Sequence, residues 1–551
     1  MTKRHPQHLP GIFDVETRIR NNHLFYGDNL TIMREMTSAS VDLIYLDPPF
    51  NSQRNYNLIY KNLTGLPVPE QEEAFCDAWD MDPEKEEMVR NMPQSFREYG
   101  ADEDLVAFWA TWINALRHTQ PRLLAYLVYM SYRLFEMRRI LKPTGSLYLH
   151  CDSTASHYIK VILDGVFGHQ NFRNEIIWKR TTAHNTTSRR LGDITDTIFF
   201  YSKTNRYVFY PPTQERDERY VENFYRFVEP DGRRYRLHDI ERNAALGIRP
   251  NLIYEYKGYT PQYGWMMTRE KLEEFDRLGK LAWNSKGRPL RKIYLNEVAP
   301  PKVGNLWDDI PPIQASASER LGYPTQKPIA LLDRIITASS NPGDVVFDPF
   351  CGCGTAIYAA HLSGRKWIGC DIAILSVQLV RDVLFRRYGL QEGEHYEVSG
   401  VPLSVEGAQD LFNRDPRQFQ HWSVELAGGF SSTKHSGDLG VDGRIHFETG
   451  DSLKNMVISV KGGKLTPAFV RELRGVLERE PNSEMAGFIC LQEPTKGMIS
   501  EAASAGTYTY LGKEYHRLQI RTIQDLLDGK AFDTPSKVQT LGWIAQPMLP
   551  M

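Results

Sequence analysis

The stretch from His23 to Phe50 constrains the fold more than any other part of the chain. It reads as a strand (HLFYG), a polar turn, a helix (LTIMREM) and a nearly all-apolar strand, VDLIYL, that ends at Asp47. Strands this apolar are typical of parallel sheets with both faces covered by helices. The same rhythm returns with helix 329–339, strand 345–348, a Gly-rich loop, helix 356–363 and strand 367–371. We therefore predict an α/β domain assembled from two distant parts of the chain.

The region between these two parts is less regular. Residues 60–104 carry prolines at 67, 69, 83 and 93 and predict a loop, and residues 108–141 predict a long helix that Pro121 kinks or divides. Strands are predicted at 146–150, 174–178 and 197–201. From about 201 to 300 Arg, Tyr, Gly and Pro are frequent without clean periodicity, which indicates an irregular insertion.

Composition narrows the class of protein. A chain of 551 residues exceeds one ordinary core, so roughly two to four domains are expected. The contents of 41% hydrophobic and 24% charged residues are ordinary for a soluble protein. No apolar run of about twenty residues and no apolar leader occurs, which predicts a cytoplasmic protein that spans no membrane. Six scattered cysteines indicate reduced thiols, and the Cys351-x-Cys353 spacing favours a tight loop over a zinc site.

The tetrapeptide Asp47-Pro48-Pro49-Phe50 is the sharpest local feature, because ligands of open α/β sheets bind just beyond strand carboxyl ends. Two prolines fix φ twice and remove two N–H donors, which leaves carbonyls beside a carboxylate and an aromatic face. An exocyclic base amine needs two acceptors and a stacking surface once the base leaves the duplex. Asp47 and the Pro48 carbonyl could be those acceptors, and Phe50 the surface. The plainer alternative is a tight turn after a strand.

The second feature is the loop Asp348-Pro-Phe350-Cys-Gly352-Cys-Gly354-Thr355 between a strand and a helix. Its glycines allow a close approach of backbone to a ligand at a helix N-terminus. The next strand ends in Asp371, at the place where a carboxylate accepts ribose hydroxyls. Neither G-x-G-x-x-G nor a Walker lysine is present, so a nucleoside cofactor without a long phosphate tail fits better. Alternatively, the loop only packs a helix on its strand.

Together these segments resemble the amino-methyltransferases that modify DNA. Asp47-Pro-Pro-Phe50 matches their catalytic motif, Asp348 to Thr355 matches their S-adenosylmethionine loop, and Pro324-Thr-Gln-Lys-Pro328 resembles the segment before that loop. The catalytic motif comes first, and this order is similar to the permuted β class, in which the insertion recognises the target. The resemblance implies a Rossmann-like methyltransferase sheet made of residues 20–180 (catalytic half) and 301–395 (cofactor half), with 181–300 as the target-recognition region.

The resemblance also assigns roles to individual residues. The methionine end of the cofactor would be shaped by Asp348, Phe350, Gly352, Gly354 and Thr355. Asp371 would hold the ribose, Lys327 would lie near the same site, and Asp28 resembles a residue near the cofactor adenine, although Gly-Asp-Asn is also simply a turn. Direct in-line transfer needs orientation and electrostatics rather than a cysteine nucleophile. Asp at position 47 usually accompanies N6 of adenine in this family, and N4 of cytosine remains the alternative.

The insertion offers candidates for reading double-stranded DNA. The candidates for phosphate or guanine contacts are Arg189, Arg190, Arg233, Arg234 and Arg236. Tyr220, Tyr225 and Tyr235 could stack or bind phosphate. For any single one of these the sequence favours an ordinary surface role, and no target site can be derived.

Residues 400–535 form a separate segment that resembles Mrr-like restriction-endonuclease folds. Glu425, Asp442 and Lys461 lie on matching positions, and Asp442 would be a ligand of Mg²⁺. Ser459 stands where that family more often has Gln or Glu. The tail is therefore either a nuclease or a non-cleaving DNA-binding domain. The sequence predicts a site-specific adenine methyltransferase with such a domain, and a homodimer is compatible with it. The rivals are an RNA or protein methyltransferase, a nuclease with an idle methyltransferase, and a non-catalytic DNA-binding protein.

Overall fold

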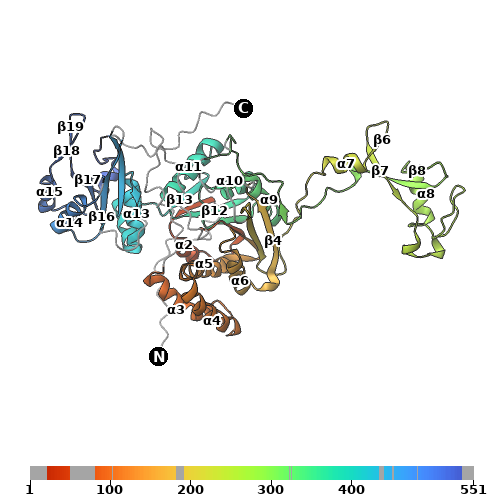
Figure 1. The fold of residues 1–551 in the computed structure, drawn as a ribbon, viewed down its shortest axis with the longest axis horizontal. Coiled ribbons are helices and arrows are strands. Elements are labelled where there is room, and N and C mark those ends of the chain that lie inside the picture. Colours follow the sequence, from red (N-terminus) through yellow and green to blue (C-terminus); the bar gives the residue numbers. More distant parts are fainter. Residues whose placement is uncertain are drawn as a thin grey trace. The chain divides into compact units, whose positions relative to one another are not determined.

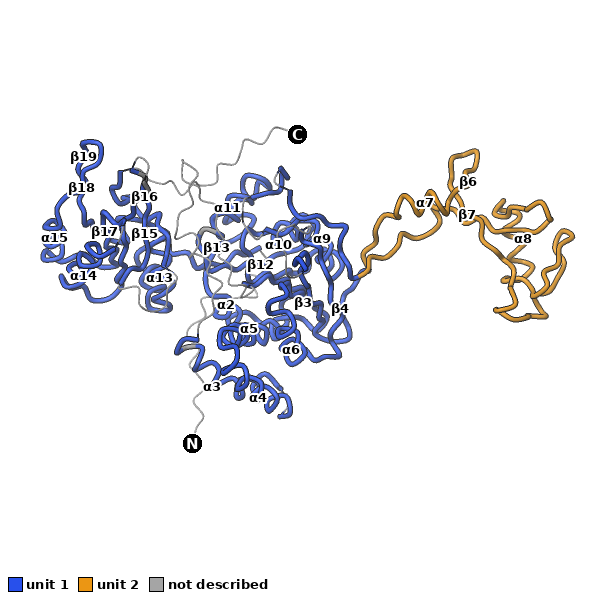
Figure 2. The backbone as a smooth tube through the Cα atoms, in the orientation of Figure 1, with its two compact units in different colours: residues 1–210, 305–551 blue, residues 211–304 orange. Residues whose placement is uncertain are grey.

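The computed structural model describes residues 22–49, 81–101, 103–181, 191–314, 316–321, 323, 326–432, 440–449, 452–480 and 482–535. Two compact units share the chain, one of residues 211–304 and one of the remainder (Figure 2). No helix in the described part of the chain is long and apolar enough to cross a membrane.

A nine-stranded sheet forms the centre of the larger unit (Figure 1). In spatial order its strands are β10 (Leu306–Trp307), β4 (Phe172–Lys179), β5 (Thr195–Ser202), β3 (Leu141–Cys151), β2 (Val41–Leu46), β11 (Val345–Asp348), β12 (Lys366–Asp371), β1 (Asn22–Tyr26) and β13 (Tyr396–Ser399). All neighbours pair in parallel except β5, which runs antiparallel to β3 and β4. The predicted strands at 174–178 and 197–201 are thus confirmed as β4 and β5.

The two distant parts of the chain join where β2 pairs with β11, with Ile44 opposite Phe347. From β11 the chain continues to β12 on one side, and β2 is flanked by β3 on the other. This is a reversal of strand order, the point where open α/β sheets bind ligands beyond the carboxyl ends of their strands. Asp47 follows β2 and Asp348 ends β11, so the fold brings the two sequence motifs to this point.

Helices cover the sheet and bury its apolar residues. They are α2 (Asn29–Glu35), α5 (Pro121–Ile140), α6 (Ser156–Phe167), α9 (Ile329–Ser339), α10 (Thr355–Leu362) and α11 (Ile374–Tyr388). One large core joins Ile44 and Phe347 of the central strands to Leu127 of α5 and Ile159 of α6. The burial of both sheet faces explains why VDLIYL contains almost no polar side chain.

One correction and one confirmed alternative concern the segment before β3. Part of the predicted loop 60–104 is the helix α3 (Pro83–Glu98), which begins with Pro83 in its first turn and Asp82 as the N-cap. Proline is well tolerated in a first turn, and the helix buries Val89, Met92 and Phe96, which share one face. The predicted helix 108–141 is divided into α4 (Glu103–Thr119) and α5, which starts at Pro121.

The insertion is also more ordered than predicted. Within residues 211–304 an antiparallel sheet has the order β6 (Phe227–Val228), β7 (Arg234–Asp239), β9 (Pro289–Tyr294), β8 (Leu281–Trp283), accompanied by α7 (Glu218–Phe224) and α8 (Arg269–Arg277). Its small core contains Trp265, Leu272 and Phe275. Strands this short give little periodicity. The compact unit spans 211–304 and so begins later than the predicted region 181–300, because β5 belongs to the main sheet.

Residues after β13 build a second sheet within the larger unit. The chain runs α12 (Val405–Arg414), α13 (Pro416–Leu426), β14 (Phe430–Ser431), β15 (Gly443–Thr449), β16 (Ser452–Lys461), α14 (Pro467–Leu477), β17 (Ser483–Cys490), α15 (Lys496–Ala503), β18 (Thr507–Tyr510), β19 (Lys513–His516), β20 (Leu518–Thr522) and α16 (Ile523–Leu527). The sheet order is β14-β15-β16-β17-β20, antiparallel up to β16 and parallel beyond it.

Candidate active site

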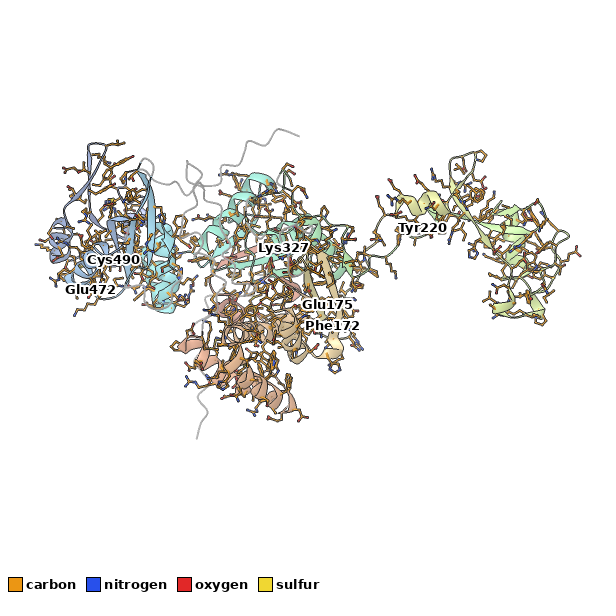
Figure 3. The ribbon with its side chains drawn as sticks, viewed as in Figure 1. Phe172, Glu175, Tyr220, Lys327, Glu472 and Cys490 are labelled. Atoms are coloured by element: carbon orange, nitrogen blue, oxygen red, sulfur yellow. The ribbon has the colours of Figure 1, made fainter. Side chains whose placement is uncertain are left out.

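The carboxylate of Asp47 lies just beyond β2, followed by a buried Pro48 and an exposed Pro49. Its Oδ2 is paired with the ammonium of Lys327 (labelled in Figure 3). Its Oδ1 is buried and has no hydrogen-bond partner among the described residues. A buried acceptor without a partner is costly unless a ligand supplies the donor. Asp47 therefore presents one acceptor to an incoming N–H group. Phe50, the predicted stacking surface, lies outside the described residues.

Lys327 sits two residues before α9, and its side chain is one-tenth exposed. The sequence placed it near the cofactor, and the structure pairs it with Asp47. Its charge also acts on Asp196 and Asp348, where it lowers the pKa of each carboxyl against the effect of burial. A buried lysine surrounded by three carboxylates supplies the countercharge that these groups need in a site of low dielectric constant.

Asp348 ends β11 and is buried, and burial raises its pKa well above the ordinary value. The Phe350 N–H donates to its Oδ1 at 3.0 Å, which opposes that rise, and the charge of Asp47 reinforces it. Phe350 itself packs partly buried against the main core. The carboxyl of Asp348 thus shapes the start of the Gly-rich loop.

The two predicted glycines both have positive φ, at +49° for Gly352 and +85° for Gly354. Gly354 is the residue before α10, and a Cβ there would lie 2.8 Å from the Tyr358 hydroxyl and from a methyl group of Val380. An alanine would therefore be strained by conformation and by contact. Thr355 follows as the first residue of α10 and is buried. The loop is a cradle of bare backbone at a helix N-terminus.

Asp371, at the end of β12, is tied to this loop. Its Oδ2 accepts from the Gly352 N–H at 2.8 Å and its Oδ1 from the Ala373 N–H at 2.9 Å. Burial raises the pKa of Asp371 to about 6, and these hydrogen bonds oppose the rise. The carboxyl is thus held in a fixed orientation beside the glycine cradle.

Asp28 lies just beyond the end of β1, the strand next to β12. The N–H of the preceding residue, Gly27, donates to the Asp371 carbonyl at 2.9 Å. The Asp28 side chain caps α2 through Thr31 and forms an ion pair with Arg133. Arg133 is buried and also donates to Asn29 at 2.6 Å, and Asn29 donates to the Pro349 carbonyl at 2.8 Å. Asn29 and Arg133 were not predicted from the sequence. An arginine inside a largely apolar helical segment is a signal that could have pointed to Arg133.

A buried polar chain behind Asp47 was also missed. The Tyr45 hydroxyl lies 3.0 Å from Nδ1 of His150, and Nε2 of that ring lies 3.1 Å from Asp196. Burial alone would raise the pKa of Asp196, but His150, Lys327 and Arg180 lower it. Sequence patterns could not reveal this chain because its members come from three different strands.

Two of the three nuclease-like residues, Asp442 and Lys461, lie close together in the structure. The ammonium of Lys461 lies 3.9 Å from Oδ2 of Asp442, which also accepts from the Val460 N–H at 2.6 Å and the Ser459 hydroxyl at 3.3 Å. Glu425 accepts a hydrogen bond from the backbone of Ile374 in the domain of the nine-stranded sheet, and the charge of Asp371 acts on it. No cluster of three or more metal-ligating side chains occurs among the described residues.

The recognition candidates in the insertion fall into different environments. Tyr225 is buried and therefore unsuited to stacking on a base, and the Arg236 guanidinium lies over its ring. Arg233 is half-exposed and pairs with Asp231. Tyr220 (labelled in Figure 3) is partly exposed, and its ring packs at a tilt against that of Phe224 with ring centres 4.6 Å apart. Arg189 and Arg190 lie outside the described residues.

Comparison with known proteins identifies DNA methylases as relatives of this chain. The model of the N6/N4 DNA methylase family matches residues 41–381. The type II methyltransferase M.EcaI of Enterobacter cloacae is 34% identical over 259 residues, which cover 46% of this chain and 56% of that protein. The DNA adenine methyltransferase YhdJ of Escherichia coli is 26% identical over 351 residues, covering 63% of this chain and 78% of that protein.

The chain spans little more than half the length of M.EcaI. Among solved structures, the DNA modification methylase TTHA0409 of Thermus thermophilus, complexed with S-adenosylmethionine, is 18% identical and covers 69% of this chain and 99% of that one. The TM-score of that match is 0.31.

Proposed function

Because this chain belongs to the N6/N4 DNA methylase family, we propose that it transfers a methyl group from S-adenosylmethionine to N6 of adenine at specific sites in double-stranded DNA. The buried Oδ1 of Asp47, to which none of the described residues donates a hydrogen bond, carries this proposal, at the reversal of strand order beside the loop with Gly352 and Gly354. The site offers the acceptor that a base amine requires, next to a place where a nucleoside cofactor can approach the backbone.

The residues present fit S-adenosylmethionine. Gly352 and Gly354 both have positive φ, so the loop presents backbone without a Cβ at the N-terminus of α10. Asp371, whose carboxyl accepts from the Gly352 N–H, would accept the ribose hydroxyls. Phe350 and Thr355 would border the methionine end, and Asp28 the adenine end. When bound, the cofactor supplies an electrophilic methyl group.

The chain's own residues then orient the nucleophile. Asp47 Oδ1 and the Pro48 carbonyl accept the two N–H groups of the amine, which directs the nitrogen lone pair away from both. Lys327 fixes Oδ2 and leaves Oδ1 for the base. Asp47 is also placed to accept the proton that the nitrogen releases after transfer. These residues contribute by orientation and electrostatics, two effects that can lower the activation barrier of an enzymatic reaction by several kcal/mol.

Product analysis tests the choice of base. The unaltered protein is incubated with methyl-labelled S-adenosylmethionine and unmethylated DNA, and the DNA is digested to nucleosides. We expect label in N6-methyladenine. Label in N4-methylcytosine would move the assignment to the alternative base, and DNA without label would contradict the proposed activity.

Cofactor affinity should depend on pH through Asp371. A carboxyl whose pKa is raised to about 6 is charged above that pH and neutral below it. Only the charged carboxylate of Asp371 accepts ribose hydroxyls with both oxygens. The dissociation constant of the cofactor should therefore be constant above pH 7. Below pH 6 it should rise by up to about tenfold per pH unit. Calorimetric titration between pH 5 and 8 measures this. Asp371→Asn should bind weakly and without this pH dependence, and an unaltered profile in that variant would exclude Asp371.

We further propose that residues 400–535 form a nuclease-like domain. The order of elements, with α13 before β14-β15-β16 and α14 leading to a parallel β17, supports this, as does the proximity of Asp442 and Lys461. Asp442 would hold Mg²⁺ and Lys461 would orient a water. The alternative is a domain that binds DNA without cleaving it, which Ser459 favours because a hydroxyl is a weak ligand.

A nicking assay decides between these roles. With supercoiled DNA we expect slow nicking that requires Mg²⁺ and is lost in Lys461→Ala, while Lys464→Ala, altered at a nearby lysine, retains it. Binding of DNA without nicking, on methylated and unmethylated substrates alike, would assign the domain a binding role.

A further inference from the structure

The helices α12 and α13 precede the second sheet, yet they pack along the cofactor edge of the first. Arg414 at the end of α12 acts electrostatically on Glu35 of α2. Gln418 of α13 is buried beside Gly27, with its Nε2 3.6 Å from where a Cβ of that glycine would stand. These contacts place the first turns of the second domain at the carboxyl end of β1.

The connection to this edge is tight. Gly400, which follows β13, has a φ of +93°, and a Cβ there would lie 2.1 Å from the carbonyl oxygen of Tyr26. The chain therefore passes directly over the end of β1 on its way to α12. Such a close crossing leaves no room for a side chain and anchors the start of the second domain to the first.

Glu425, near the end of α13, makes the most specific contact. It accepts a hydrogen bond from the Ile374 N–H, three residues beyond Asp371, and its Oε2 is buried without a partner among the described residues. Burial raises the pKa of Glu425 to about 8, with the charge of Asp371 adding to the rise. Within the described part of the chain no cationic side chain counters this rise, so the carboxyl is neutral at pH 7.

We infer that α13 forms part of the support of the cofactor site, with Glu425 and Gln418 as positioning residues for the segment that carries Asp371. This inference rests on the proposed binding of S-adenosylmethionine. Its consequence is thermodynamic linkage, because a ligand that binds tighter when α13 is docked must in turn favour docking. Occupancy of the methyl-donor site would thereby be communicated to the nuclease-like domain.

The decisive comparison uses three variants of the full chain. Glu425→Ala removes the acceptor for Ile374, Glu425→Gln retains it in a neutral group, and Glu406→Ala alters an exposed carboxylate of α12 as the matched control. We expect Glu425→Ala to weaken cofactor binding by about tenfold, as loss of one buried hydrogen bond implies. Glu425→Gln and the control should stay within about twofold of the unaltered protein.

Kinetics and hydrogen exchange separate positioning from general damage. Glu425→Ala should raise KM for the cofactor, while kcat and KM for DNA stay within about twofold. Gln418→Ala should show the same pattern, and it replaces Glu425→Ala in the test if that variant folds poorly. The cofactor should slow amide exchange in residues 416–426 of the unaltered protein. If Glu425→Ala bound the cofactor as tightly as the unaltered protein, or if the cofactor did not change amide exchange in α13, this inference would be overturned while the proposed function would stand. Failure of the unaltered protein to bind the cofactor would overturn the proposed function as well.

Discussion

Replacing Asp47 with alanine is expected to lower the rate of methyl transfer by about a thousandfold while cofactor affinity changes by less than about threefold. Loss of one preorganised group aimed at the reacting centre commonly costs about a hundred- to a thousandfold in rate. Here the lost group is the buried acceptor that the structure leaves open. Asp47 lies just beyond β2, whereas the cofactor residues cluster at the ends of β11 and β12 and in the loop after β11, so cofactor binding should survive. Single-turnover transfer and calorimetric titration measure the two effects.

Asp42→Ala is a suitable control for this experiment. Asp42 lies on β2, the strand that Asp47 follows. It pairs with Lys142 and accepts from the Val345 N–H, at the end of the sheet away from the site. Its replacement should affect stability more than transfer. If Asp47→Ala retained a tenth or more of the rate, Asp47 would not be the group that holds the amine.

The second large effect is expected for Lys327→Met, which should lower kcat by about a hundredfold. The variant keeps the length of the side chain and removes the charge that neutralises Asp47. Removal of one partner from a buried ion pair costs about 3–5 kcal/mol, because the other charge remains without compensation. Both side chains are largely buried, at 10% and 15% exposure, so solvent screens the pair little. Rapid-quench measurement of transfer at saturating cofactor and DNA gives this rate.

Lys327→Arg tests whether charge or shape matters. Arginine keeps the charge but has a planar head of different size, so it should recover part of the lost rate. Equal activity of Lys327→Met and the unaltered protein would show that the pair with Asp47 serves stability alone, which thermal unfolding of the variants would then reveal.

The sequence predicted those parts of the fold that alternate between apolar strands and amphipathic helices. The elements at 41–46, 329–339 and 345–348 were predicted with their observed bounds, because buried parallel strands leave few ambiguous residues. The helix α3 was missed because its prolines were read as loop signals, although one stands in a first turn where proline is favoured. The short strands of the insertion carry too little pattern to be found.

The site was predicted only as far as its residues stand in local motifs. Asp348 and Asp371 end their strands and Asp47 directly follows its own, so the sheet topology suffices to bring the three to one edge. The pairing of Lys327 with Asp47, across 280 residues, depends on tertiary contacts that no local pattern contains. For the same reason the sequence could not predict that Glu425 accepts a hydrogen bond from Ile374, near Asp371 in the sequence.

Photo-cross-linking of methyl-labelled S-adenosylmethionine to the unaltered protein, followed by peptide mapping, tests the central claim most directly. The claim is that the donor and the base meet where β2 pairs with β11. We predict that label, displaced by excess unlabelled cofactor, appears in peptides that contain Asp47 or residues 345–355. Displaceable label confined to residues 400–535, or to the insertion 211–304, would contradict the account.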